Sequence, residues 1–122
     1  MATTTTTSPT IERAIEGCLQ CVYRCSASLD EALANDPSAM ADCIRLCHEC
    51  APVCGLCATL LSAHSRFAQQ LCGVCADICD ACATECGKHA YIEAMRRSAE
   101  ACRSCAKACR EVAKSDPSRK AA

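Results

Sequence analysis

The stretch "LCGVCADICDACATEC", residues 71–86, carries five cysteines at a helical spacing. Successive cysteines are three, four, three and four residues apart. Gaps that alternate between three and four place side chains on one face of an α-helix, at the positions that point into a helical bundle. The stretch therefore predicts a helix with a stripe of thiols along its buried side.

The other cysteines repeat this spacing in three further groups, so the sequence predicts four such helices. Within every group the gaps are again three or four residues. The sixteen cysteines are Cys18, Cys21 and Cys25; Cys43, Cys47, Cys50, Cys54 and Cys57; Cys72, Cys75, Cys79, Cys82 and Cys86; and Cys102, Cys105 and Cys109.

Capping signals mark where the helices begin. Ser8 followed by Pro9 is typical of an N-cap and first helical turn, and this helix is expected to run to about residue 34. Asp36 and Ser65 can cap the second and third helices in the same way. Each predicted cap precedes a cysteine group by seven to ten residues.

Short breaks separate the predicted helices. They lie at "NDPS" (35–38), near His64 and at Gly87-Lys88, and the fourth helix is expected over about 90–114. Short linkers favour antiparallel neighbours, so we expect an all-α, antiparallel up-down-up-down four-helix bundle. The expected boundaries are a disordered tail over 1–8, the bundle over 9–114 and a C-terminal tail over 115–122 that contains "SDPS".

Composition limits the partners and the location. The net charge of −1 implies no nucleic-acid or anionic-membrane partner. The N-terminus shows no secretory or twin-arginine signal, and no segment has about 18 consecutive apolar residues, so no membrane span is expected. We therefore expect a cytoplasmic protein, in a compartment where thiols stay reduced.

Two simple explanations of the cysteines fit poorly. Residues three or four apart on a helix have Cβ atoms about 5–6 Å apart, whereas a disulfide needs about 3.5–4.5 Å. A plain apolar core is the second explanation, but the chain has no tryptophan and only one phenylalanine. Sixteen small thiols would leave such a core underfilled, so something else should occupy the volume.

A soft monovalent metal fits the thiols best. Four zinc ions on sixteen thiolates would bury a net charge of −8, whereas sixteen Cu(I) ions on bridging thiolates sum to zero. Thiolate softness also selects Cu(I). The alternative is an iron–sulfur electron-transfer or cluster-scaffold protein. Its cluster-wrapping loop and Cys-Pro ligand are missing from the motif "CLQCVYRC".

The four stripes "CLQCVYRC", "CIRLCHECAPVCGLC", "CGVCADICDACATEC" and "CRSCAKAC" resemble the bacterial copper storage proteins, over about residues 9–114. This resemblance implies a four-helix bundle with a cysteine-lined core loaded with Cu(I), a homotetramer of such bundles, and the cytosolic branch of the family. The expected role is copper storage and detoxification rather than catalysis. The expected partners are copper ions and a copper chaperone or cuproenzyme that exchanges them.

The stripes also predict extra ligands at one end of the bundle. Met40 lies three residues before Cys43, His89 lies three after Cys86, and Met95 lies seven before Cys102. In an up-down-up-down bundle these three residues share one end, where a thioether and an imidazole suit a transferring Cu(I) site. The alternative is ordinary core methionine and surface histidine.

The opposite end is expected to form an apolar plug without ligands. His48 lies off the stripe and His64 lies at a turn, so both are expected to be surface residues. The residues assigned to the plug are Ile11, Ile15, Leu60, Leu61, Phe67, Leu71 and Val112.

Overall fold

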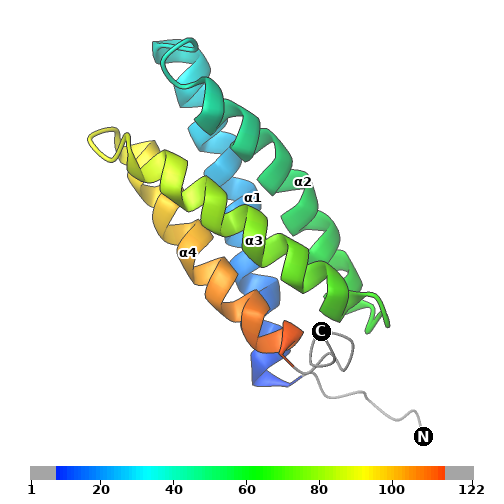
Figure 1. The fold of residues 1–122 in the computed structure, drawn as a ribbon. Helices are drawn as coiled ribbons and strands as arrows, with labels where there is room; N and C mark the ends of the chain where they lie inside the picture. The colour runs from blue at the N-terminus through cyan, green and yellow to red at the C-terminus, as the bar shows by residue number, and fades with distance from the viewer. Residues whose placement is uncertain (1–7, 115–122) are drawn as a thin grey trace, which may run out of the picture.

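Four antiparallel helices make up the part of the chain that the structure, a computed structural model, describes, residues 8–114 (Figure 1). No strand occurs among these residues, so the expected all-α up-down-up-down bundle is confirmed. The expected tails, apart from Ser8, and the "SDPS" break lie outside the described residues. The helices are α1 (Pro9–Asn35), α2 (Ala41–Ser62), α3 (Ala68–Gly87) and α4 (Glu93–Ala113).

The predicted cap at Ser8 is confirmed, whereas Asp36 caps the turn before α2 and not the helix itself. The Ile11 amide donates to Ser8 Oγ at 3.2 Å, with Pro9 in the first turn of α1. Asp36 accepts a hydrogen bond from the Ala39 amide at 3.2 Å, so it caps the turn after α1. The helix α2 begins five residues after Asp36, with Met40 at its N-cap position.

The turn after α2 closes the helix with a left-handed residue. His64 has φ of 54°, and its amide donates to the Leu61 carbonyl at 3.2 Å. The Ser65 amide donates to the Leu60 carbonyl at 2.9 Å, which completes a Schellman motif. Ser65 Oγ accepts from the Phe67 amide at 3.1 Å, so this predicted cap serves the turn that leads into α3.

Pro52 lies inside α2 without ending it. Proline removes the amide that would bond to the carbonyl of His48, four residues earlier. The helix nevertheless keeps its phase, because Cys50 and Cys54 on either side of Pro52 are both at most 1% exposed. The helix α2 is long and apolar enough to cross a membrane, a criterion that core helices of soluble proteins also meet. Here its cysteine-bearing face is buried and it packs against α1 and α3.

Each helix packs against two neighbours, so the four stripes meet along the bundle axis. α1 packs on α2 and α4, and α3 packs on the same two helices. The loops 36–40 and 88–92 lie at one end of the bundle, which we call the gate end; the α2–α3 loop lies at the other, the closed end (Figure 1). Cysteine and alanine dominate the interior, and Met95 is the largest fully buried side chain.

Gly17 lets α1 approach α4 closely. A Cβ atom on Gly17 would lie 3.2 Å from the Cys105 Cα atom, which belongs to backbone and cannot rotate away. The corresponding atom on Gly55 would meet only the Val22 side chain, at 3.8 Å, an ordinary contact. Close approach at Gly17 brings the thiols of α1 and α4 into reach of each other.

The two glycines give a matched test of this packing. Gly55→Ala should raise the free energy of unfolding of the metal-free protein by about 0.5–1 kcal/mol, because alanine favours the helix. Gly17→Ala should lower it by about 1 kcal/mol or more, because overpacking outweighs that gain. Urea unfolding under reducing conditions measures both, and an equal gain in both variants would contradict the close approach.

Candidate metal centre

All sixteen predicted cysteine ligands lie in the interior as free thiols. Each is at most 1% exposed. The helical phase read from the sequence therefore places every thiol on the axis of the bundle. Because all are unpaired, the interior presents sixteen sulfur atoms that can bind metal.

The sulfur atoms are spaced for bridged metal binding along the whole core. A linear S–M–S unit needs sulfurs about 4.6 Å apart, twice a thiolate bond of about 2.3 Å. Five sets have all their sulfurs within 4.8 Å of one another, and the first three share cysteines. The sets are Cys18, Cys57, Cys75 and Cys109; Cys18, Cys54, Cys75 and Cys105; Cys21, Cys54, Cys79 and Cys105; Cys25, Cys50, Cys82 and Cys102; and Cys43, Cys47 and Cys86. The fourth is linked to the third by the Cys50–Cys79 contact of 3.6 Å and to the fifth by the Cys47–Cys82 contact of 3.7 Å.

Several thiol pairs four residues apart on one helix are close neighbours. The sulfurs of Cys50 and Cys54 are 3.7 Å apart and those of Cys105 and Cys109 are 3.9 Å apart. Cys21 and Cys25 instead share a neighbour on α4, the sulfur of Cys102, at 3.9 and 3.6 Å. Spacing along a single helix therefore describes only part of the sulfur network.

Contacts between helices are as short as those within them. The sulfurs of Cys43 and Cys86 are 3.2 Å apart, joining α2 to α3. Cys18 on α1 lies 3.7 Å from Cys109 on α4. Sequence reasoning missed these pairs, because the register between two helices is set by their packing. A bound ion can therefore bridge helices as well as turns of one helix.

Hydrogen bonds between neighbouring thiols shift their pKa values in both directions: they lower the pKa of Cys72, for example, through Cys109 and Cys57. Hydrogen bonds with Cys105 and Cys109, together with burial, raise the pKa of the Cys18 thiol. Hydrogen bonds with Cys102 and Cys105, and burial, likewise raise the pKa of Cys79. No charged side chain is buried among residues 8–114 to stabilise a thiolate. A metal that binds here must displace protons and supply the positive charge itself.

The structure brings one of the three predicted gate ligands against a thiol. Met95 is fully buried, and its Sδ lies 3.6 Å from Cys43 Sγ. Met40 is 3% exposed at the N-cap of α2, three residues before Cys43. His89 is half-buried after α3, and its ring lies edge-on to Tyr91 with the centroids 6.2 Å apart. Met95 therefore extends the sulfur network, while Met40 and His89 lie within one turn of it.

Two serines that sequence reasoning missed complete the gate end. Ser28 and Ser98 are fully buried and are the buried polar side chains of the described chain other than the thiols. Ser98 Oγ lies 3.6 Å from the sulfurs of both Cys25 and Cys86. Both serines continue the stripes, since Ser28 follows Cys25 by three residues and Ser98 precedes Cys102 by four. The prediction extended the stripes as far as Met95 but passed over both serines, because a hydroxyl is not a soft metal ligand.

The apolar plug at the closed end is confirmed except at Phe67. Leu61 and Val112 are buried, and the isoleucines and other leucines assigned to it pack partly buried against the core. Phe67 is 54% exposed, and the Arg66 guanidinium lies 4.9 Å from its ring centroid. The prediction for Phe67 was wrong because this residue belongs to the turn before α3, outside the helical stripe.

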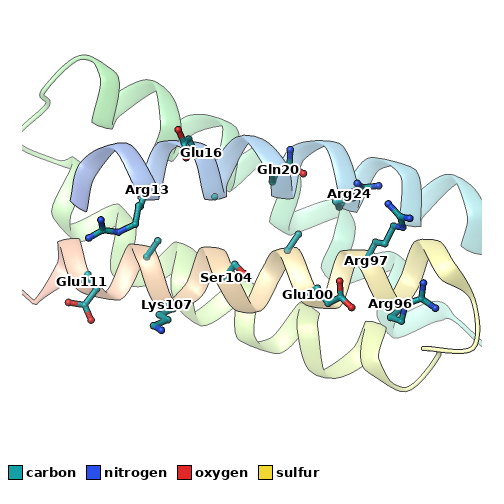
Figure 2. A pocket seen from close by; sticks show the side chains of 13 residues that line it. Arg13, Glu16, Gln20, Arg24, Arg96, Arg97, Glu100, Ser104, Lys107 and Glu111 are labelled. Atoms are coloured by element: carbon teal, nitrogen blue, oxygen red, sulfur yellow. The ribbon is translucent and has the colours of Figure 1, made fainter. Parts of the chain in front are cut away.

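The outer surface between α1 and α4 is a charged groove without thiols. Its lining includes Arg24, Arg97 and Glu100, whose side chains point away from the core in Figure 2. His48 and His64 are exposed, as expected from their positions off the stripe. Within the described residues, the thiol groups placed to bind metal are therefore those on the bundle axis.

Fold and site define a class of protein, a helical bundle whose cysteine-lined interior can bind many soft monovalent ions. The sequence profile of the copper storage protein family matches residues 7–114. None of the curated proteins compared matches the chain. Three solved structures are similar over most of their length.

Apo copper storage protein 3 from Bacillus subtilis is 39% identical, with 84% of this chain and 97% of that chain covered and a TM-score of 0.77. The Cu(I)-bound copper storage protein BsCsp3 is 38% identical, with 85% and 98% covered and a TM-score of 0.80. A cytosolic copper storage protein from Streptomyces lividans with five coppers is 38% identical, with 88% and 94% covered and a TM-score of 0.82.

The chain belongs to the copper storage protein family. The comparison agrees with the geometry, because the thiol core lies inside the matched range and its sulfur spacing suits Cu(I). Storage of copper as multiple Cu(I) ions is therefore the function of this fold and this core, and the iron–sulfur alternative is not favoured.

Copper loading should release protons. Because hydrogen bonding and burial raise the pKa of Cys18 and of Cys79, these thiols are protonated at neutral pH. Each Cu(I) that binds should displace about one proton. For each proton displaced, lowering the pH by one unit should therefore weaken the apparent affinity for Cu(I) about tenfold. An indicator dye in weak buffer measures this release during anaerobic titration.

Copper-saturated protein is the control, since its thiols carry no protons to lose. Loading of the metal-free protein without proton release would contradict a neutral thiol core.

Proposed function

We propose that the protein buffers and detoxifies cytoplasmic copper by filling its core with about one Cu(I) per cysteine, without acting as an enzyme. The observation that carries this is the set of sixteen buried free thiols whose neighbouring sulfurs lie within bridging distance. The cytoplasmic location is supported by the Streptomyces lividans relative, which is a cytosolic copper storage protein. The predicted ligands are the sixteen cysteines with Met40, His89 and Met95.

Charge balance supports a loading near one ion per thiol. Equal numbers of Cu(I) and thiolate give a neutral core, which needs no buried counter-ion. Four zinc ions would leave an uncompensated charge of −8 on sixteen thiolates. Bridging thiolates are available along the core, because three neighbouring sulfur sets share Cys18 or Cys54 and the Cys47–Cys82 contact of 3.7 Å links the last two sets.

Storage rather than catalysis is supported by the lack of room for a substrate. The described interior is occupied by thiols, alanines and Met95, and a loaded core would be filled further. Exchange with a copper chaperone or cuproenzyme would then occur at an end of the bundle. We propose the gate end, because Met95 contacts Cys43 there, whereas the buried residues Leu61 and Val112 at the closed end offer no ligand.

Assembly into a homotetramer is the second part of the proposal. Leu19 and Tyr23 on α1 and Leu56 on α2 are each more than half exposed. Apolar side chains of this size on the outside of a bundle favour contact between subunits. Sedimentation equilibrium of the metal-free protein tests the assembly, and a monomer at micromolar concentration would exclude it.

Anaerobic titration tests the loading directly. Cu(I) added to reduced protein should produce ultraviolet thiolate charge transfer that rises linearly to about 16 ions per chain. Metal analysis after gel filtration gives the bound number, and protein with alkylated thiols is the control. Saturation at about four ions would contradict a bridged Cu(I) core and favour tetrathiolate sites.

The gate is tested by kinetics. Met40→Leu, His89→Ala and Met95→Leu together should slow both uptake and removal of copper by a chelator, because neutral ligands there would pass ions to the first thiolates. The final loading should fall by no more than a few ions. Stopped-flow absorbance with a chromogenic Cu(I) chelator measures both rates.

A matched variant at the closed end carries Phe67→Leu and Leu71→Val, which conserve apolar character and add no metal ligand. Unchanged rates in the gate variant, with altered rates in this control, would place the route at the closed end.

A further inference from the structure

The thiol core changes its composition at the gate end. Deeper in the bundle each set of neighbouring sulfurs has four cysteines, but the last set has only Cys43, Cys47 and Cys86. All three come from α2 and α3. At this level α1 contributes Ser28 and α4 contributes Ser98 and Met95. All three side chains are fully buried. Two hydroxyls and a thioether therefore stand where two more thiols would continue the stripes.

Ser28 is placed to bond to three different sulfurs. Its hydroxyl donates to Met95 Sδ at 2.8 Å. The same oxygen lies 3.6 Å from Cys47 Sγ, which donates to it, and 3.9 Å from Cys86 Sγ. Rotation about one bond can thus redirect the Ser28 proton from the thioether to either thiol sulfur.

Cys86 is the sulfur on which both hydroxyls converge. Ser98 Oγ lies 3.6 Å away and Ser28 Oγ 3.9 Å away. Ser98 also reaches Cys25, the first thiol of the next set, at 3.6 Å. The two serines therefore flank the three-thiol set on the sides that α1 and α4 provide, while Cys82 links that set to the rest of the core at 3.7 Å from Cys47.

Charge explains why hydroxyls suit this position. One Cu(I) on three thiolates carries a net charge of −2, and at the end of the core fewer neighbouring ions share these thiolates. Hydrogen bonds to a charged acceptor are stronger than those between neutral groups. A serine hydroxyl can stabilise a thiolate in this way, whereas another thiol at the same position would bind copper and extend the core.

We propose that Ser28 and Ser98 make Cys43, Cys47, Cys86 and Met95 the terminal Cu(I) transfer site of the core, at the gate end. This inference rests on the copper-storage function proposed above. In the metal-free protein the Ser28 hydroxyl holds Met95; when Cu(I) binds, that hydroxyl turns to the Cys86 or Cys47 thiolate and frees the thioether for copper. Each S–H bond replaced by S–Cu gives its proton to solvent, and copper stays Cu(I).

The serines are positioning residues, and removing their hydroxyls tests them. Ser28→Ala and Ser98→Ala should each weaken binding of the first Cu(I) equivalent at this site about tenfold, measured by competition with bicinchoninate. Ser28→Thr and Ser98→Thr keep the hydroxyl and should restore it. Ser26→Ala on α1 and Ser104→Ala on α4 remove exposed serines and should change nothing.

A spectroscopic readout separates positioning from simple loss of stability. With methionine labelled at its ¹³C-methyl group, the Met95 signal should shift on the first equivalents of Cu(I). In Ser28→Ala the metal-free signal should already be displaced, because the 2.8 Å hydrogen bond is lost. Ser28→Cys keeps the volume and extends the thiol stripe, so it should raise the loading by about one ion and slow copper release.

Two results would overturn the inference. The first is that Ser28→Ala and Ser98→Ala both bind the first Cu(I) equivalent as tightly as the wild-type protein. The second is that the controls Ser26→Ala and Ser104→Ala lose as much affinity as these two variants do. The proposed function fails separately, if the wild-type protein itself does not take up about one Cu(I) per cysteine.

Discussion

Neutrality of the buried thiols is the constraint on which the rest of the structure depends. Sixteen thiols share one interior, and no charged side chain is buried with them among residues 8–114. An uncompensated buried charge costs several kcal/mol, so thiolates can form there only when a cation accompanies each one. Protons and Cu(I) ions both meet this requirement. The same bundle can therefore exist empty and loaded.

Such a core also explains the rest of the chain. The thiols pack against one another along the axis, with neighbouring sulfurs 3.2 to 4.0 Å apart, and features outside the axis also hold the helices in place. These include the Ser8 cap, the Schellman turn at His64 and the close approach at Gly17. Because none of these features uses a thiol, the fold does not compete with metal for its ligands.

The fold could be predicted because its signals are local and repeated. Alternating gaps fixed the buried face of each helix, and the structure buries every cysteine. Helix starts were less predictable: α4 begins at Glu93, three residues later than expected, and Asp36 and Ser65 cap turns before the helices. Capping side chains serve turns and helices equally, so sequence alone cannot separate the two.

The sequence predicted which cysteines lie in the core, but not which sulfur atoms contact one another across helices. Cross-helix pairs such as Cys43 with Cys86 depend on the register between helices, which no single stripe contains. Phe67 was misplaced because apolar character does not show which residue of a turn is buried. Ser28 and Ser98 were not predicted because serine carries no soft-ligand signal, although the phase of the stripes continues through both.

The most direct measurement is the location of copper inside the loaded protein. Crystals of copper-saturated protein, measured at the copper absorption edge, give an anomalous difference map in which only copper is strong. The account predicts a row of peaks along the bundle axis, between the thiols of the four helices and reaching Met95. Peaks confined to the exposed His48 and His64 or to surface carboxylates, with the axis empty, would contradict it.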